Sequence, residues 1–263
     1  MFGEIISTST LEENPEKLNF AVISAGIACE NHGNIISCEN YGNISGESTT
    51  RLMLVFVGGI CSISGANSGT EILISKCKVE AELYAKGGTI DGAELSQQEK
   101  NVVNAYVGGI AARSSSVVEN NIMGTNLNSL AKIEECTFNG KITNNADIAF
   151  AGGIVGEAYY STIKKSAAKV HIDNQKEGLD DCALYYTNLA GAIYSTDSSF
   201  YKENHYVQMV SSSSTSPKLY GRFYIPLYGA YQTFIYEDEN QINNVFALTK
   251  VNSFDDIPAG VVL

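Results

Sequence analysis

The side chains of this chain that could perform acid–base chemistry are carboxylates and histidines. Glycoside hydrolysis needs two carboxyl groups roughly 5 to 10 Å apart, because one protonates the leaving oxygen while the other acts as base or nucleophile. The candidates on the polar segments are Glu157, Asp173, Asp180 and Asp181. Asp180 and Asp181 follow a glycine and are typical of a polar turn, and no spacing among the four defines a pair. A polysaccharide-active hydrolase or lyase therefore stays an alternative.

The three histidines are His32, His171 and His205, and none stands near a Ser or Cys in a nucleophile arrangement. We expect all three at the surface. His171 lies between Val170 and Ile172, so strand alternation points it outward if its neighbours point inward. The sequence thus predicts no catalytic residue and a protein that is not an enzyme.

Six cysteines are present, and no two have the Cys-x-x-Cys spacing of zinc sites. Cys38, Cys77 and Cys136 recur at equivalent places, followed in the next copy by Ser166. This recurrence predicts an inward ladder of free thiols. The cysteines without such equivalents are Cys29, Cys61 and Cys182, and a disulfide among them stays open. We predict neither a metal nor a cofactor.

Tyrosines gather late in the chain, where ten of the fifteen lie at or after Tyr185. A tyrosine ring offers a flat apolar face with a polar tip, which suits stacking on sugars or docking a protein. The candidate ligand-binding residues are Tyr185, Tyr186, Tyr194 and Tyr201. The favoured alternative is that the late tyrosines cover the open end of a stacked fold, where terminal repeats must change.

A repeated unit must position these residues. A small residue and glycine closed by Ile recurs at 25–27, 58–60, 108–110, 152–154 and 191–193. In four copies, an Ile-x-x-Cys/Ser segment and another apolar segment follow, with period-two alternation and many β-branched residues. Three strands per unit predict a triangular coil, with about five three-stranded rungs stacked into a parallel β-helix. The glycines are expected at corners that need positive φ or close backbone approach.

The unit resembles the GLUG-motif repeats of bacterial surface and secreted, adhesin-like proteins. Gly153-Ile154-Val155-Gly156 carries the whole core motif, whereas earlier copies replace the last glycine by Cys29, Ser62 and Ala112. The similarity runs from about residue 20 to 172. The resemblance implies a right-handed parallel β-helix within a larger chain, on the cell surface or outside the cell. The family motif carries no catalytic residue.

We divide the chain into β-helix repeats at 1–215, with an N-terminal cap at about 1–19, and a β-rich cap or small domain at 216–263. Residues 85–101 and 114–129 are expected as surface loops, 94–103 as the one candidate helix, 219–236 as paired strands and 237–239 as a solvated hairpin tip. Pro226 should stand at an edge or bend.

The amino-acid composition limits the classes of partner that we expect. The formal net charge is −12, with arginines only at positions 51, 113 and 222, and no basic stripe that could bind nucleic acid. No run reaches the ~20 apolar residues of a membrane helix, and the start is unlike a signal segment. We therefore expect no membrane insertion by this segment. The predicted function is an adhesin-like binding scaffold that contacts a glycan or a protein, with a passive stalk or spacer as another alternative.

Overall fold

The computed structural model describes residues 5–9, 21–48, 54–87, 104–121, 123–175, 183–195, 197–211 and 216–258. Four sheets contain most of the strands. Sheet A holds β1 (Ile5–Ser9), β5 (Glu39–Asn40), β6 (Ile44–Ser48), β10 (Lys78–Lys86), β16 (Thr137–Asn145), β20 (Ala167–Asn174), β24 (Asn204–Val207), β25 (Val210–Ser211) and β28 (Leu248–Val251). Sheet B holds β2 (Ala21–Ala25), β7 (Leu54–Gly58), β11 (Asn104–Gly108), β17 (Ile148–Gly152) and β21 (Ala183–Thr187).

Sheet C holds β3 (Ala28–Asn31), β8 (Cys61–Gly65), β12 (Ala111–Ser115), β18 (Val155–Tyr159), β22 (Ala190–Ile193), β26 (Leu219–Ile225) and β27 (Ala230–Tyr236). Sheet D holds β4 (Asn34–Ile36), β9 (Glu71–Ser75), β15 (Leu130–Glu134), β19 (Thr162–Lys164) and β23 (Tyr201–Lys202). A separate hairpin consists of β13 (Val118–Asn121) and β14 (Gly124–Leu127). The helical segments are η1 (Ser198–Phe200), η2 (Pro226–Tyr228), α2 (Glu239–Phe246) and η3 (Phe254–Asp256).

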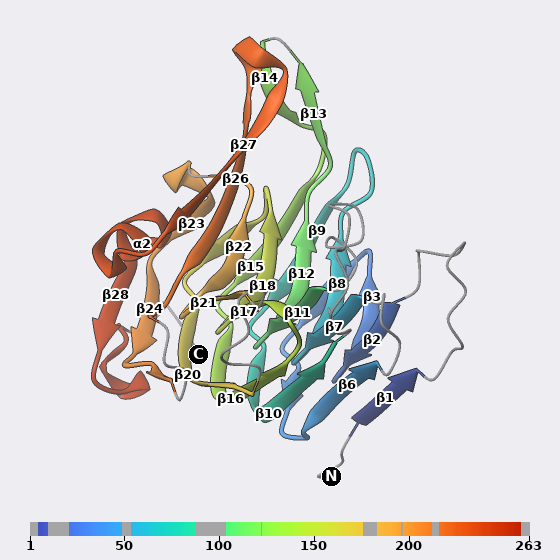
Figure 1. Ribbon diagram of the computed structural model, residues 1–263, viewed down its shortest axis with the longest axis vertical. Helices are drawn as coiled ribbons and strands as arrows, with labels where there is room; N and C mark the ends of the chain where they lie inside the picture. The colour runs from blue at the N-terminus through green and yellow to red at the C-terminus, as the bar shows by residue number, and fades with distance from the viewer. Residues whose placement is uncertain are drawn as a thin grey trace.

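The chain visits sheets B, C, D and A in turn, and each strand pairs in parallel with its equivalents one coil before and after, for example β7 with β2 and β11. The result is an all-β solenoid of parallel sheets (Figure 1). Its coils have four strands, not the three that the sequence predicted. In the first four copies the glycine-Ile segment is the reason, because it is a corner between two strands: β7 ends at Gly58 and β8 begins at Cys61, for example. The fifth copy, residues 191–193, lies instead within β22.

Close approach of backbones explains the corner glycines. A Cβ atom on Gly109 would lie 2.1 Å from the carbonyl oxygen of Gly153 and 2.3 Å from Cγ of Phe138. Gly59 would meet the oxygen of Gly109 at 2.0 Å in the same way. None of these corner glycines has positive φ, so the stacked neighbour, rather than the turn conformation, excludes a side chain.

The corner from sheet D to sheet A uses the left-handed conformation instead. The residue before each small residue of the ladder has φ between 50° and 55°: Ser37, Lys76, Glu135, Lys165 and Glu203. Two of the three predicted ladder thiols stack inside, whereas Cys38 in the first coil is only half-buried. Cys77 and Cys136 are buried, and the backbone amide of Cys136 donates to Oγ of Ser166. Asn204 ends this ladder with a polar side chain, since its Nδ2 donates to the carbonyls of Ile163 and Phe246.

The core lies between the sheets and repeats from coil to coil. The corner residues Ile60, Ile110 and Ile154 are fully buried, whereas Ile27 at the same place in the first coil is 50% exposed. The amide of each corner isoleucine donates to the corner carbonyl of the next coil, for example Ile60 N to Ile110 O at 2.9 Å. Equivalent residues thus share one environment only where a coil stacks on both sides.

The C-terminal segment continues two of the sheets. Strand β26 pairs in parallel with β22, and β28 pairs with β24. Strands β26 and β27 form the antiparallel hairpin predicted for 219–236, and Pro226 begins the turn at its tip. Residues 237–239 are not a hairpin tip, because Asp238 caps helix α2 by accepting from the amides of Asn240 and Gln241. The boundary between residues 215 and 216 stays a prediction.

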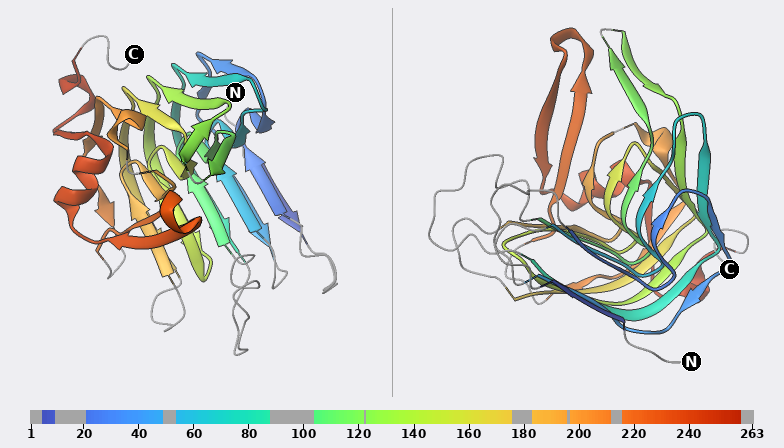
Figure 2. Two further views of the ribbon diagram at one scale, coloured as in Figure 1. Left: turned by 90° about the horizontal axis from the view of Figure 1, so that it is seen from above. Right: turned by 90° about the vertical axis from the view of Figure 1, so that its right-hand side faces the viewer.

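Two hairpins rise from the coils at one end of the longest axis (Figures 1 and 2). One is β26–β27, and the other is β13–β14, which replaces the loop expected at 114–129. The candidate helix at 94–103, Cys182, and the carboxylates Asp180 and Asp181 lie outside the described residues. Among the helices that the structure does describe, none is long and apolar enough to cross a membrane.

Candidate functional site

A row of aromatic rings runs along the outer face of sheet B. Val55 and Val57 of β7 belong to the core, so alternation turns Phe56 to the opposite face. The register places Tyr106, Phe150 and Tyr185 beside it on successive strands. The four rings stack with centroid distances of 5.0, 5.2 and 5.3 Å. Each stacked pair contributes about 0.5–1.5 kcal/mol beyond the area it buries.

An ion pair with a buried carboxylate lies on the outer face of sheet C. Arg113 of β12 and Glu157 of β18 are register partners, and Nε of Arg113 lies 2.8 Å from Oε2 of Glu157. The Glu157 side chain is only 5% exposed, against 39% for Arg113. Burial raises the pKa of the Glu157 carboxyl, while Arg113, a hydrogen bond from Tyr194 and the charge of Arg222 oppose that rise.

The β26–β27 hairpin adds rings and a second cation to this face. The Tyr220 ring meets those of Phe150 and Tyr185 edge-on at 5.4 Å, which joins sheet C to the row on sheet B. The guanidinium carbon of Arg222 lies 4.7 Å from the ring centre of Tyr231 and 6.0 Å from that of Tyr194. Both distances are within the range of cation–π attraction.

Hydroxyl contacts fix this hairpin in place. The Tyr231 hydroxyl lies 3.2 Å from that of Tyr159, and Nδ2 of Asn120, on β13, also donates to it. The rings of Tyr159 and Tyr194 pack at 4.7 Å. We call the whole surface the aromatic corner; its residues are Phe56, Tyr106, Arg113, Phe150, Glu157, Tyr159, Tyr185, Tyr194, Tyr220, Arg222 and Tyr231.

Three tyrosine hydroxyls of the aromatic corner have raised pKa values. Burial raises the pKa values of Tyr106, Tyr159 and Tyr194, and the Glu157 carboxylate raises those of Tyr106 and Tyr194 further. Like ordinary tyrosines, these hydroxyls keep their protons at neutral pH and act as neutral donors and acceptors, and the raised pKa values extend that state further into the alkaline range. Neutral hydroxyls beside half-buried rings and two guanidinium groups can hydrogen-bond and stack on a polar ligand.

A hollow of about 470 Å³ adjoins the corner, with Tyr194 in its wall. It lies between the two hairpins and is also lined by Thr125 of β14 and Phe223 and Tyr224 of β26. Asp197 also lines the hollow, and one of its carboxylate oxygens accepts a hydrogen bond from the backbone amide of Ser199. Aromatic walls with a few polar groups are typical of small-ligand sites.

The structure separates the four predicted tyrosines. Tyr185 and Tyr194 are half-buried and belong to the aromatic corner. Tyr186 is fully buried and Tyr201 is 1% exposed, so neither ring offers a face to a ligand. For Tyr186 the reason is alternation, since neighbours on a strand point to opposite faces. Tyr201 packs edge-on against Phe246 of α2 at 5.0 Å, which is the end-covering role weighed as the alternative.

The acid–base candidates do not come together. Glu157 lies on sheet C, whereas Asp173 lies on sheet A, where it is 2.8 Å from Nζ of Lys141. His171 points outward between buried neighbours, as predicted, and His32 is exposed. His205 is 7% exposed, so its predicted surface position is wrong: its strand lies inside sheet A, between β20 and β28. Within the described ranges, no group of three or more His, Cys, Asp or Glu could hold a metal ion.

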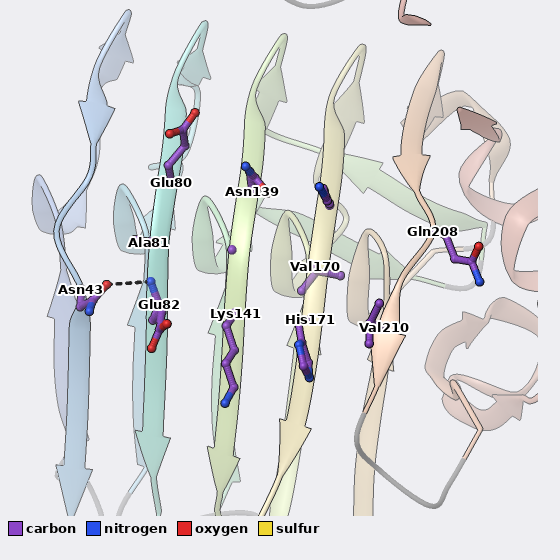
Figure 3. Close-up of a pocket in the computed structure, with 12 residues that line it drawn as sticks. Asn43, Glu80, Ala81, Glu82, Asn139, Lys141, Val170, His171, Gln208 and Val210 are labelled. Carbon is purple, nitrogen blue, oxygen red and sulfur yellow. Dashed lines mark hydrogen bonds between the residues drawn. The ribbon is translucent and has the colours of Figure 1, made fainter. Parts of the chain in front are cut away.

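A second hollow, of about 520 Å³, lies on the outer face of sheet A (Figure 3). Glu82, Lys141 and His171 line up across three neighbouring strands, and the amide of Glu82 donates to Oδ1 of Asn43. The described residues that line it include no tyrosine or phenylalanine. This face resembles a solvated sheet surface more than a site for a ring-shaped ligand.

Several residues of the aromatic corner were missed from the sequence, although one signal points to them. Phe56, Tyr106 and Phe150 each stand two places before the first corner glycine, in line with Tyr185. An aromatic at one fixed position of a stacked repeat predicts a row of rings. Arg222 and Tyr231 have no such signal, because their place depends on how the hairpin folds back.

No family model, curated protein or solved structure matches this chain.

Proposed function

We propose that this chain is a non-enzymatic binding scaffold of a cell-surface or secreted protein, and that the aromatic corner binds a glycan. In this proposal the solenoid is a right-handed parallel β-helix of about five coils, of the GLUG type. The solenoid holds the strands in register, and the aromatic corner and its adjoining hollow contact the ligand.

The observation that carries the proposal is the gathering of half-buried tyrosines with guanidinium groups on one outward surface. Tyr106, Tyr185 and Tyr194 keep part of each ring exposed, although they stand on strands whose opposite faces form the core. Sugar rings pair an apolar face with equatorial hydroxyls, so a surface of rings, hydroxyls and planar donors complements them. Within the row on sheet B, Phe56 and Phe150 are buried, so Tyr106 and Tyr185 are the rings that can face a sugar.

The experiment is a glycan-array screen of the purified protein with Tyr194→Ala and Tyr185→Ala. We expect selective binding by the wild type and its loss or strong reduction in both variants. Tyr41→Ala is the matched control, because Tyr41 is 39% exposed and donates to Glu39 outside the corner. The proposal fails if the wild type binds no glycan, which would favour a spacer or a scaffold for proteins, or if the three variants bind equally.

A polysaccharide-active enzyme is the second candidate, and one observation favours it. Glu157 is a buried carboxyl whose pKa is raised, and such a group can serve as a general acid. It contacts Tyr194 at the surface proposed to hold the sugar. Release of reducing ends from a bound glycan by the wild type, and its loss in Glu157→Gln, would establish this activity. Unchanged chain length after prolonged incubation would exclude it for the glycans tested.

A further inference from the structure

The aromatic corner collects cations in a chain that has few of them. The protein has a formal net charge of −12 and only three arginines. Two of the three, Arg113 and Arg222, lie in the corner, although they stand on strands far apart in the sequence. With Glu157 ionised, the charged groups of the corner as defined above sum to +1, because two guanidinium groups face one carboxylate.

The two arginines are held differently. Arg113 is engaged with Glu157 at 2.8 Å, so much of its charge is already matched inside the protein. Arg222 packs instead against the rings of Tyr231 and Tyr194. A ring below a guanidinium group holds its plane without using its N–H donors, and those donors stay available along the edge of the plane.

We propose that Arg222 binds the oxyanion of an acidic sugar, so that the preferred ligands are glycans carrying carboxylate or sulfate groups. This inference rests on the proposed glycan binding and names its ligand class. The guanidinium edge forms two parallel N–H···O bonds with a planar carboxylate, and Tyr194 and the row on sheet B support the sugar ring. The acidic remainder of the surface repels such a ligand, so the local positive charge also directs it to the corner.

The fork of donors makes the arginine distinct from any other cation. A lysine at position 222 would retain the charge but lose the paired donors and the guanidinium group that packs against Tyr231. A glutamine would lose the charge and the paired donors. The order of affinities for an acidic glycan should therefore be wild type, then Arg222→Lys, then Arg222→Gln.

The test is a calorimetric titration of the purified protein with matched pairs of oligosaccharides. An oligogalacturonate is compared with its methyl ester, which has the same backbone without charge, and a sulfated galactan fragment is compared with its desulfated form. We expect each charged member to bind at least about tenfold more tightly than its neutral partner, since a charge-assisted bidentate contact is lost in the latter. Arg222→Gln should lower the affinity for the charged members much more than for the neutral members, and so remove that preference.

Lys202→Gln is the control variant, because Lys202 is an exposed cation on sheet D whose side chain pairs with Glu203. It should keep the preference. Circular dichroism of each variant checks that it is folded. The carboxylate and sulfate pairs show which oxyanion is preferred.

Equal binding of charged and neutral members, or a preference that persists in Arg222→Gln, would overturn the acidic-ligand inference while leaving glycan binding intact. Failure of every member to bind would overturn this inference for these glycans, and the glycan array described above then decides separately whether the proposed function fails with it.

Discussion

The two faces of sheet B differ in the residues that the same repeat places on them. The inner face carries Val55, Ala105 and Ala149 at equivalent positions, all fully buried among stacked coils. The outer face carries Tyr106 and Tyr185 one position further along, half-buried beside a hairpin. The inner positions are limited to small or branched residues by the coils above and below. The outer positions are free of that limit, so they are where a ligand surface can be built.

The largest effect should come from disturbing a corner at which inner faces meet. Gly109→Ala would place a Cβ atom 2.1 Å from a backbone oxygen, so the stacked coils must move apart. We expect a loss of about 3 kcal/mol or more in the free energy of unfolding, measured by urea denaturation. Gly33→Ala is the control, because nothing lies within 4 Å of its Cβ position. A similar change in both variants would contradict the stacking explanation.

A sharper comparison uses two neighbours on one strand. Tyr186→Ala removes a fully buried ring and should cost about 3–5 kcal/mol of stability. Tyr185→Ala removes a half-buried outer ring that contacts Phe150 and Tyr220, and we expect it to cost about 1–3 kcal/mol while abolishing glycan binding. Thermal unfolding measures the first effect and the binding screen the second. Equal losses of stability would mean that the outer row supports the fold as much as the core does.

The pH dependence of stability probes the outer face of sheet C. Burial raises the pKa of Glu157 in the folded protein above the unfolded value of about 4.3, so the folded state keeps its proton at pH values where the unfolded state has lost it. The stability from this proton is complete below the unfolded pKa and is lost as pH rises through the folded pKa. In Glu157→Gln, this part of the decline should vanish.

Melting temperatures between pH 3 and 8 measure that difference. The wild type should lose stability relative to the variant as the pH rises from about 4. Parallel profiles of the two proteins would show that Arg113, Tyr194 and Arg222 fully offset the burial of Glu157.

The smallest effect distinguishes the thiols of the ladder from one at the surface. A hydrogen bond with Cys136 is the main cause that lowers the pKa of Cys77 to about 7, yet Cys77 is 1% exposed. We expect a water-soluble maleimide to modify the exposed Cys29 in the native protein, and Cys77 and Cys136 only after unfolding. Peptide mass spectrometry locates the label. Native labelling of Cys77 would mean that the coils open locally there.

Much of the solenoid follows from the sequence, because stacking makes each coil obey the same rules. The recurrence of glycines, isoleucines and cysteines predicted parallel stacked strands, which are confirmed, and an inward thiol ladder, which is confirmed for Cys77 and Cys136 but not for the half-buried Cys38. The predicted number of strands in a coil was wrong because the glycine-Ile segment was interpreted as one strand. It is the corner between two strands, such as β7 and β8. Helix α2 was missed because its start, Asp238 followed by Glu239, also fits an acidic turn.

The site was predicted in part for a similar reason. Tyr185 was identified from the local density of tyrosines, but the same density also selected Tyr186 and Tyr201, which are buried. Density in a sequence does not record which face a residue occupies. The strand register determines that face. Because neighbours on a strand point to opposite faces, alternation would have separated Tyr185 from Tyr186.

The sequence by itself determined what is periodic: parallel stacked strands, small residues at shared positions and, in four coils, an aromatic residue at one fixed place. It could do so because neighbouring coils impose the same steric limits on equivalent residues. Only the tertiary structure decided where the β26–β27 hairpin lies, and with it the meeting of Arg222, Tyr231 and Tyr194. These residues belong to no common repeat position, so their contacts depend on long-range packing that no local pattern records.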